Sequence, residues 1–283
     1  MPTWKIAGVQ MDCRLGDKTH NLKVIRDRLR QAAGQGARLV VFPECALTGY
    51  CFETSEEAAA HSEPLEGPSA AAVAGDCARL GVWAAFGFLE RGKAEFFNSV
   101  ALVGPHGVVA SYRKVHMPCL GVDRFATAGN RPFAVHDLGG LRLGINICYD
   151  GSFPESSRVL TILGADLIVL PTNWPTGAAS TAKYLVPARA LENHVYYMAV
   201  NRVGEERGFR FIGQSQIADC DGELLACSQT DEAILYGEID PEHARRKQIV
   251  KIPGKYEINR VAHRRPEMYG PLCQLPAAPG GIQ

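Results

Sequence analysis

The sequence predicts an α/β fold in which helices cover the outer faces of buried sheets. Segments typical of strands and helices alternate before and after a central run of strands, which is the order of an α/β protein. The predicted strands, for example 39–42 and 167–170, are almost wholly apolar, as expected for strands buried on both faces. The 283 residues, 46% of them hydrophobic, contain no repeat and no Gly/Ser linker, so we expect one compact domain.

Hydrophobic periodicity predicts the elements of the first half of the chain. Residues 4–10 alternate apolar and polar side chains like a half-buried strand, and residues 21–33 carry apolar side chains at helical spacing before Gly34. A Glu- and Ala-rich segment then leads to a second helix at 69–80. Further strands are expected at 39–42, 82–90, 98–103 and 108–113.

The second half of the chain continues the alternation. Strands at 133–137 and 142–147 lead to a helix after Pro154, a residue that suits the first turn of a helix. The remaining expected elements are a strand at 167–170, a helix at 178–192, strands at 196–201, 215–219, 223–226 and 233–239, a short helix from Pro241, and a tail with Pro and Gly.

Charge and cysteine usage narrow the functional class. The formal net charge is zero, so we expect neither a nucleic-acid nor an anionic-membrane partner. No secretion signal and no apolar segment of membrane-spanning length occurs, which predicts a soluble cytoplasmic protein. The nine cysteines include no CxxC pair, and His116 with Cys119 lacks a second ligand pair. We therefore expect reduced thiols and no metal.

Cys148 lies where the predicted strand 142–147 turns into the helix after Pro154. A thiol at such a corner is close to the positive end of a helix, and that field favours the nucleophilic thiolate. The simpler interpretation is a buried structural cysteine. Side chains elsewhere in the chain must decide between the two.

Glu44 and Lys114 are the residues that could assist Cys148. Glu44 follows the apolar strand 39–42, where partial desolvation would raise its pKa and suit it to proton transfer. Lys114 follows the strand 108–113. Taken alone, Glu44 could be a solvated loop residue and Lys114 a surface charge beside Arg113.

Three motifs occur in a fixed order along the chain. They are Phe42-Pro43-Glu44, Tyr112-Arg113-Lys114 with His116, and Cys148-Tyr149-Asp150 with Phe153-Pro154-Glu155. Together they resemble the signatures of the nitrilase superfamily of carbon–nitrogen hydrolases. The similarity continues through 165–168, 173–174, 189–193 and 201–202 and so covers nearly the whole chain.

This resemblance implies a four-layer α-β-β-α sandwich that forms a homodimer or larger homo-oligomer, with a Glu44, Lys114 and Cys148 triad at strand ends. In such a site Cys148 attacks an amide carbonyl, and Lys114 with the Tyr149 backbone N–H holds the oxyanion. Glu44 moves the protons. The resemblance implies no metal and no organic cofactor.

The family pattern places a further glutamate after the lysine motif, whereas the acid in this region of the chain is Asp123. Asp123 could orient the substrate or a catalytic neighbour, or could pair with Arg124. Asn173 and Trp174 follow a predicted strand and are expected to line the pocket, although Trp174 could equally pack at its rim. Tyr50 and Tyr149 are further pocket candidates.

We predict a carbon–nitrogen hydrolase domain at 1–262 and a C-terminal tail at 263–283 that lies at a subunit interface. The predicted activity is hydrolysis of a small carboxamide through a cysteine thioester. N-carbamoyl amide hydrolysis, nitrile hydrolysis and a non-catalytic interaction module are the alternatives. Nitrile-hydrolysing members of the superfamily resemble one another in having Trp-Glu after the nucleophile. Here the dipeptide is Tyr149-Asp150, as in the amidase branches.

Overall fold

The structure, a computed structural model, describes residues 3–274. Its contacts divide the chain into a body, Met1–Arg245, and a C-terminal extension, Arg246–Gln283. The predicted hydrolase domain at 1–262 stays a prediction. The tail predicted at 263–283 lies partly outside the described residues.

The first sheet of the body has six strands, and its centre is parallel. Strands β1, β2 and β3 run in parallel, and the outer strands pair with them or with each other in antiparallel fashion. In spatial order the strands are β14 (Ala233–Ile239), β1 (Trp4–Gln10), β2 (Leu39–Val41), β3 (Trp83–Arg91), β4 (Phe96–Gly104) and β5 (Gly107–Arg113).

The second sheet also has six strands with a parallel centre, formed by β7, β8 and β9. In spatial order its strands are β13 (Leu224–Cys227), β12 (Gln216–Ala218), β9 (Tyr196–Val200), β8 (Leu167–Pro171), β7 (Arg142–Ile145) and β6 (Val135–Asp137). After β13 the chain crosses back to the first sheet, where β14 pairs with β1 along seven residues, Ala233–Ile239.

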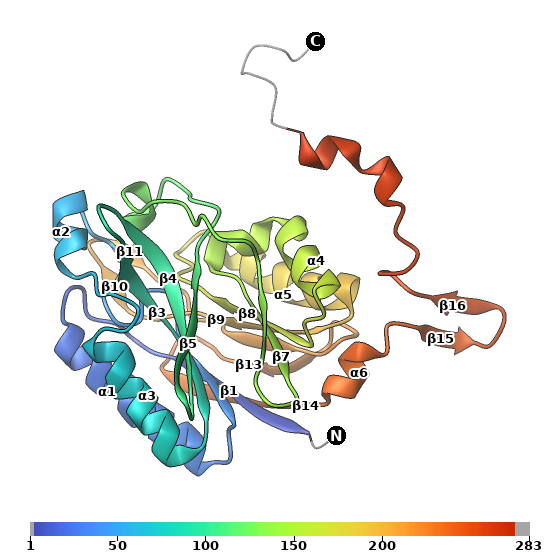
Figure 1. Ribbon diagram of the computed structural model, residues 1–283, viewed down its shortest axis with the longest axis horizontal. Coiled ribbons are helices and arrows are strands. Elements are labelled where there is room, and N and C mark those ends of the chain that lie inside the picture. Colours follow the sequence, from blue (N-terminus) through green and yellow to red (C-terminus); the bar gives the residue numbers. More distant parts are fainter. Residues whose placement is uncertain (1–2, 275–283) are drawn as a thin grey trace, which may run out of the picture. The chain divides into compact units, whose positions relative to one another are not determined.

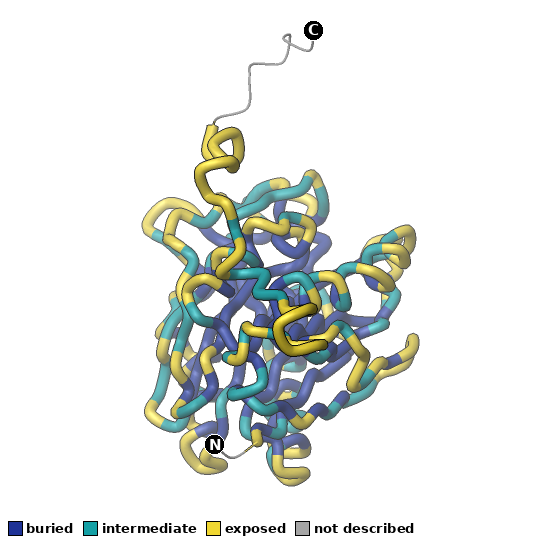
Figure 2. The backbone as a smooth tube through the Cα atoms, turned by 90° about the vertical axis from the view of Figure 1, so that its right-hand side faces the viewer, coloured by how far each residue is buried: buried dark blue, intermediate teal, exposed yellow. Residues whose placement is uncertain are grey.

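Helices cover the outer face of each sheet (Figure 1). Helices α1 (Lys18–Gly34) and α3 (Pro68–Leu80) pack on the first sheet, and α4 (Pro154–Ile162) and α5 (Ala179–Asn193) pack on the second. This arrangement confirms the predicted α-β-β-α sandwich. Figure 2 shows the buried residues in the interior of the body and the exposed residues mainly at its periphery.

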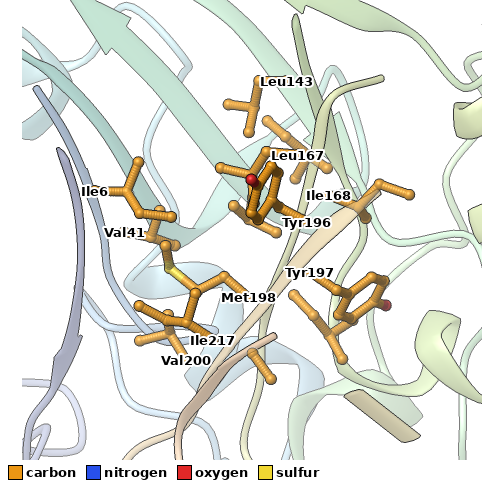
Figure 3. Close-up of a cluster of buried hydrophobic side chains, with 14 of the residues drawn as sticks. Ile6, Val41, Leu143, Leu167, Ile168, Tyr196, Tyr197, Met198, Val200 and Ile217 are labelled. Atoms are coloured by element: carbon orange, nitrogen blue, oxygen red, sulfur yellow. The ribbon is translucent and has the colours of Figure 1, made fainter. Parts of the chain in front are cut away.

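The main core lies between the two sheets. Ile6 and Val41 of the first sheet belong to the same buried cluster as Leu143, Met198 and Val200 of the second (Figure 3). A second cluster joins the first sheet to its helices, with Ile25 and Leu29 of α1 and Val73 of α3. Burial of both faces explains why these strands are nearly continuous apolar runs.

The elements that sequence periodicity did not predict are all short. Too few residues repeat in them to give a pattern. They are helix α2 (Ser55–Ala60), the hairpins β10 (Glu205–Glu206) with β11 (Phe209–Arg210) and β15 (Ile249–Ile252) with β16 (Tyr256–Ile258), and the 3₁₀ turns η1 (Gly121–Arg124), η2 (Cys148–Ser152), η3 (Pro266–Met268) and η4 (Gly270–Cys273).

The predicted short helix from Pro241 is α6 (Pro241–Arg245). Helix α1 begins at Lys18, earlier than the predicted 21, because the Asp17 side chain accepts a hydrogen bond from the His20 N–H and caps the first turn. No helix within 3–274 is both long enough and apolar enough to span a bilayer.

Gly87 on β3 leaves space for the turn that carries Glu44. A Cβ atom at this position would lie 2.2 Å from the Cys45 nitrogen and 2.5 Å from the Pro43 carbonyl oxygen. Both contacts are with backbone, so the turn itself would have to move. The first sheet therefore requires glycine here in order to hold the Glu44 turn close.

Replacing Gly87 with Ala should lower the free energy of unfolding by about 1–3 kcal/mol, because the new methyl group overlaps the Pro43–Cys45 backbone. Gly75→Ala is the matched control. Gly75 lies within α3 with no heavy atom within 4 Å of an added Cβ, so this change should be neutral or stabilising by up to about 1 kcal/mol. Urea unfolding of both variants tests the difference, and equal stability would contradict it.

Candidate active site

Four strands direct their carboxyl ends to one edge of the sandwich. Glu44 follows β2, Lys114 follows β5, Cys148 follows β7 and Asn173 follows β8. The carboxyl ends of parallel strands are where α/β proteins bind ligands. Glu44 and Lys114 are fully buried, and Cys148 retains 8% exposure. The structure thus brings the three predicted triad residues to the same edge.

The two oxygens of the Glu44 carboxylate have different surroundings. Oε1 accepts a hydrogen bond from Lys114 Nζ at 2.7 Å and one from Asn98 Nδ2 at 2.7 Å. Oε2 is buried and has no hydrogen-bond partner within the described chain. Burial raises the pKa of Glu44, although the nearby Lys114 charge opposes this. Glu44 therefore has one free, poorly solvated oxygen that can take a proton.

Lys114 lies between two carboxylates. Its Nζ donates to Glu44 Oε1 at 2.7 Å and to Asp123 Oδ2 at 2.5 Å. Burial alone would lower the pKa of Lys114, but the charges of Asp123 and Glu44 outweigh burial and raise that pKa well above its usual value. The amine is therefore a permanent ammonium in this site.

Asp123 belongs to this cluster. Its Oδ2 accepts hydrogen bonds from Lys114 and from the Tyr50 hydroxyl at 2.7 Å, and its Oδ1 accepts one from Asn98 Nδ2 at 2.8 Å. The guanidinium of Arg124 donates instead to the carbonyl oxygens of Gly121 and Phe52. Of the predicted roles for Asp123, the geometry favours the orientation of a catalytic neighbour over pairing with Arg124.

Asp150 holds the backbone turn that presents Cys148, which has a positive φ of 44°. Asp150 Oδ2 accepts hydrogen bonds from the Ile147 N–H at 3.0 Å and the Tyr112 hydroxyl at 2.7 Å. Its Oδ1 accepts the His116 N–H at 3.0 Å and lies 2.7 Å from His116 Nδ1. One buried carboxylate therefore connects the Cys148 turn to the segment that carries Lys114.

The Cys148 thiol is protonated at neutral pH. Burial and the Glu44 charge raise its pKa to about 12, while Lys114 and the Asn173 backbone N–H act in the opposite direction. The expectation that the field of the helix N-terminus favours the thiolate stays a prediction. A base must remove the thiol proton during attack.

The predicted pocket residues differ in exposure. Tyr149 is 40% exposed, and its ring packs edge-on against Phe153. Asn173 is fully buried, and neither its amide oxygen nor its amide nitrogen has a hydrogen-bond partner within residues 3–274. Trp174 is 4% exposed and joins the core between the sheets. Tyr50 is buried against Asp123.

Asn98 and Asp150 are the functional positions that sequence reasoning missed. Asn98 bridges both carboxylates of the Lys114 cluster, and Asp150 fixes the nucleophile turn. The available signal was the polar pair Asn98-Ser99 at the start of the otherwise apolar strand 98–103. Asp150 was visible as part of the cysteine motif, but its partners on the segment after β5 could not be read from the sequence.

No group of three or more His, Cys, Asp and Glu side chains in the described part of the chain is arranged to hold a metal ion. His116 Nδ1 pairs with Asp150, and the His116 ring stacks on the Phe153 ring with centroids 3.7 Å apart. Cys119 is exposed. Among the described residues, His116 and Cys119 are therefore not part of a larger group of metal-ligating side chains.

Comparison with known proteins agrees with this geometry. The sequence profile of the carbon–nitrogen hydrolase family matches residues 5–248. The chain belongs to this family. It is 39% identical over 267 residues to a protein of Pyrococcus abyssi named nitrilase, covering 94% of this chain and 98% of that protein. It is 33% identical to an (R)-stereoselective amidase of a Pseudomonas species, covering 83% of this chain and 85% of that enzyme.

Solved structures of an amidase from Nesterenkonia sp. AN1, a nitrilase-superfamily enzyme, are similar to this carbon–nitrogen hydrolase family member. One has a TM-score of 0.78 at 26% identity and covers 94% of this chain and 95% of that chain. In another, the acetamide moiety of fluoroacetamide is covalently added at that amidase's active-site cysteine. A third holds butyramide, with a TM-score of 0.74.

Raising the pH from 5 to 8 should lower the free energy of unfolding of this hydrolase family member more than that of its Glu44→Gln variant. The pKa of Glu44 is raised in the folded state, so the folded protein binds its proton more tightly than the unfolded chain does. That contribution to stability is fully present below the unfolded-state pKa and is lost as the pH rises through the folded-state value. Glutamine removes the penalty that remains at high pH.

Urea unfolding at pH 8 and pH 5 measures this effect. The free energy of unfolding of Glu44→Gln minus that of the wild type should be smaller at pH 5, where wild-type Glu44 is closer to its protonated form, than at pH 8. Glu66→Gln, at an exposed glutamate, is the control and should change stability by less than about 0.5 kcal/mol at either pH. A difference between the two proteins that does not grow from pH 5 to pH 8 would refute the raised pKa of Glu44.

Proposed function

We propose that this protein hydrolyses the carbon–nitrogen bond of a small carboxamide through a cysteine thioester, releasing a carboxylic acid and ammonia or an amine. The observation that carries the proposal is the free, buried Oε2 of Glu44. This acceptor is held beside a permanent Lys114 ammonium and acts electrostatically on a protonated Cys148. A base, a cation and a nucleophile in one buried site are what acyl transfer requires.

In the first half-reaction the Cys148 sulfur attacks the amide carbonyl carbon and its proton passes to Glu44 Oε2. The carbonyl oxygen becomes an oxyanion that Lys114 Nζ and the Tyr149 backbone N–H stabilise. The N–H groups of a helical first turn have no partner within the helix, so the Tyr149 N–H in η2 is available for this role. Removing one such donor typically slows turnover by about a hundredfold to a thousandfold.

Collapse of the tetrahedral intermediate requires a proton on the leaving nitrogen. Glu44 supplies the proton that it took from Cys148, and the amine leaves. Glu44 is then a carboxylate again and can activate the water that cleaves the thioester. Each proton taken is returned within the cycle, so the triad completes the reaction without a cofactor.

The buried Asn173 amide is the proposed substrate contact. Its backbone N–H faces the Cys148 sulfur, and its side chain carries one donor group and one acceptor without partners in the described structure. A primary carboxamide carries the complementary acceptor and donor. Trp174 would limit the acyl side of the pocket, and the half-exposed Tyr149 would lie at its entrance.

Nitriles and N-carbamoyl compounds are the competing substrate classes. The relatives carry the names nitrilase and amidase, so their names do not separate the classes. The dipeptide after the nucleophile favours an amide, because it is Tyr149-Asp150 rather than Trp-Glu. In addition, a nitrile adduct must receive its proton along a different direction from an amide's leaving nitrogen, and a site shaped for one should stabilise the other poorly.

Ammonia release from matched pairs of small carboxamides and nitriles tests the proposal, with ureido acids included as N-carbamoyl substrates. We expect turnover of at least one carboxamide, and turnover of its matching nitrile slower by about a hundredfold or more, which is roughly 2.7 kcal/mol in barrier. Cys148→Ala should abolish release while keeping a native melting curve. Comparable rates on a matched pair would move the protein to the nitrilase class, and activity in Cys148→Ala would show a different nucleophile.

We also propose that the chain forms at least a homodimer. Its cytoplasmic location stays a prediction. Helices α4 and α5 expose several large apolar side chains, which favours a covered surface. These are Val159, Ile162, Leu163, Tyr184 and Leu191.

Sedimentation should give at least twice the chain mass, and Ile162→Glu with Leu163→Glu should shift the protein to monomer. A monomeric wild type at micromolar concentration would overturn this proposal.

A further inference from the structure

Thr172 carries a buried hydroxyl group near the proposed nucleophile. The residue follows β8 and is fully buried. Its Oγ1 has no nitrogen or oxygen hydrogen-bond partner in the part of the chain that the structure describes. Buried hydroxyl groups almost always have a partner, because leaving one unpaired is unfavourable. The hydroxyl is therefore available to a group that gains charge during the reaction.

The second sheet places Thr172 next to Cys148. Strands β7 and β8 are parallel neighbours in this sheet (Figure 1). Their register pairs Ile145 with Val169, and the Asn146 N–H donates to the Val169 carbonyl oxygen at 2.9 Å. Because the bonds of a parallel pair are evenly spaced, continuing this register beyond Ile145 brings Cys148 beside Thr172.

Neighbouring strands hold both residues at this edge. The Thr172 N–H donates to the Val200 carbonyl oxygen of β9 at 2.9 Å. The η2 turn that carries Cys148 packs on β8, so that a Cβ added to Gly151 would lie 2.9 Å from Leu170 Cδ2. The β-branched side chain of threonine has few accessible rotamers. Packing therefore fixes the direction of the hydroxyl group.

We propose that Thr172 is a further catalytic residue, whose hydroxyl donates a hydrogen bond to the Cys148 sulfur whenever that sulfur carries negative charge. This inference rests on the proposed amide hydrolysis. Hydrogen bonds to an ionised acceptor are stronger than hydrogen bonds to a neutral one, so the contact gains strength as the thiolate forms. Thr172 thereby lowers the barrier of the steps that place charge on sulfur.

The charges and donors around the sulfur agree with this role. Burial and the Glu44 charge raise the pKa of the Cys148 thiol. The Lys114 charge, the Thr172 side-chain hydrogen bond and the Asn173 backbone N–H act in the opposite direction. The hydroxyl is therefore an uncharged donor that favours the thiolate.

Two of the three N–H groups of the Lys114 ammonium already have acceptors. They donate to Glu44 and Asp123. The third is the one proposed to hold the substrate oxyanion, together with the Tyr149 N–H. The sulfur therefore needs a donor of its own, and Thr172 provides it.

Two steps of the proposed cycle place negative charge on sulfur. In the first, the Cys148 S–H bond breaks, its proton passes to Glu44 and the S–C bond forms. In the second, water attacks the thioester carbon and gives a proton to Glu44. The C–S bond then breaks, its electron pair stays on sulfur, and the thiolate regains a proton from Glu44. The Thr172 hydroxyl keeps its own proton throughout.

Substitution of Thr172 leaves the titratable groups around the sulfur in place. A change in the pKa of the Cys148 thiol would therefore report the loss of the hydroxyl. These groups are Glu44 after β2, Lys114 after β5, Tyr50 and, in the same η2 turn as the sulfur, Asp150.

Thr172→Val removes the hydroxyl with little change in shape. It should lower kcat by about tenfold to a hundredfold, as expected for the loss of a hydrogen bond to a charged group, with KM changed by less than about threefold. Thr172→Ser keeps the hydroxyl, so its kcat should stay within about threefold of the wild type. Thr161→Val is the matched control and should leave kcat unchanged, because the buried Thr161 hydroxyl donates to the Ser157 carbonyl oxygen within α4.

The rate at which methyl methanethiosulfonate modifies Cys148 gives a readout that does not depend on amide turnover. The reagent contains no amide, and mass spectrometry of the Cys148 peptide separates this thiol from the others. At pH 8 Thr172→Val should react about threefold more slowly than the wild type, because a raised pKa lowers the thiolate fraction more than it raises nucleophilicity. Thr172→Ser and Thr161→Val should react like the wild type. The exposed Cys119 should react equally in all four proteins.

Three results would overturn the catalytic role of Thr172. An unchanged modification rate of Cys148 in Thr172→Val would exclude the hydrogen bond to sulfur, and a raised KM beside it would indicate a substrate contact. A slower modification without a loss of kcat would show that turnover does not need the contact. Thr172→Ala gives the same comparison if Thr172→Val lacks a native melting curve. Failure of the wild type on every amide would refute the proposed function, whereas the modification rates would still test the hydrogen bond.

Discussion

A buried ammonium is the constraint on which the rest of the site depends. Lys114 is fully buried, and an isolated charge at such a position would be strongly unfavourable unless it is paired and hydrogen-bonded. Glu44 and Asp123 provide the pairing, and Asn98 bridges the two carboxylates. Because these residues come from β2, β4, β5 and the η1 turn, the cluster can form only when the first sheet and its edge loops are assembled.

The backbone around the site is also unusual. Cys45 and Cys148 both adopt positive φ, at 50° and 44°, a conformation that is uncommon for residues other than glycine. Each follows a parallel strand and redirects the chain at the active edge. Gly87 leaves space for the first of these turns, and Asp150 holds the second through its bond to the Ile147 N–H. Strain of this kind persists where the surrounding structure fixes it.

Electrostatic interactions favour the neutral thiol in the resting site and the negatively charged intermediate in the proposed reaction. At rest, desolvation and the Glu44 charge keep the Cys148 thiol protonated, so the nucleophile is inactive until a substrate arrives. In the proposed reaction the Cys148 proton passes to Glu44 during attack, and Lys114 stabilises the oxyanion that forms. A thiol that is activated only within the substrate complex is also less exposed to oxidation and alkylation, since the thiolate is the reactive form.

The sequence by itself determined the α/β class and the order of the main strands and helices, and it predicted Glu44, Lys114 and Cys148 as the triad. Apolar runs and three motifs are local properties of the chain, and this is why they could be read without a structure. Only the tertiary structure decided the role of Asp123, the bridging by Asn98 and the protonated state of Cys148. Hydrogen bonds such as that from Tyr50 to Asp123 and the desolvation of Cys148 depend on residues far apart in sequence, and no local pattern encodes those distances.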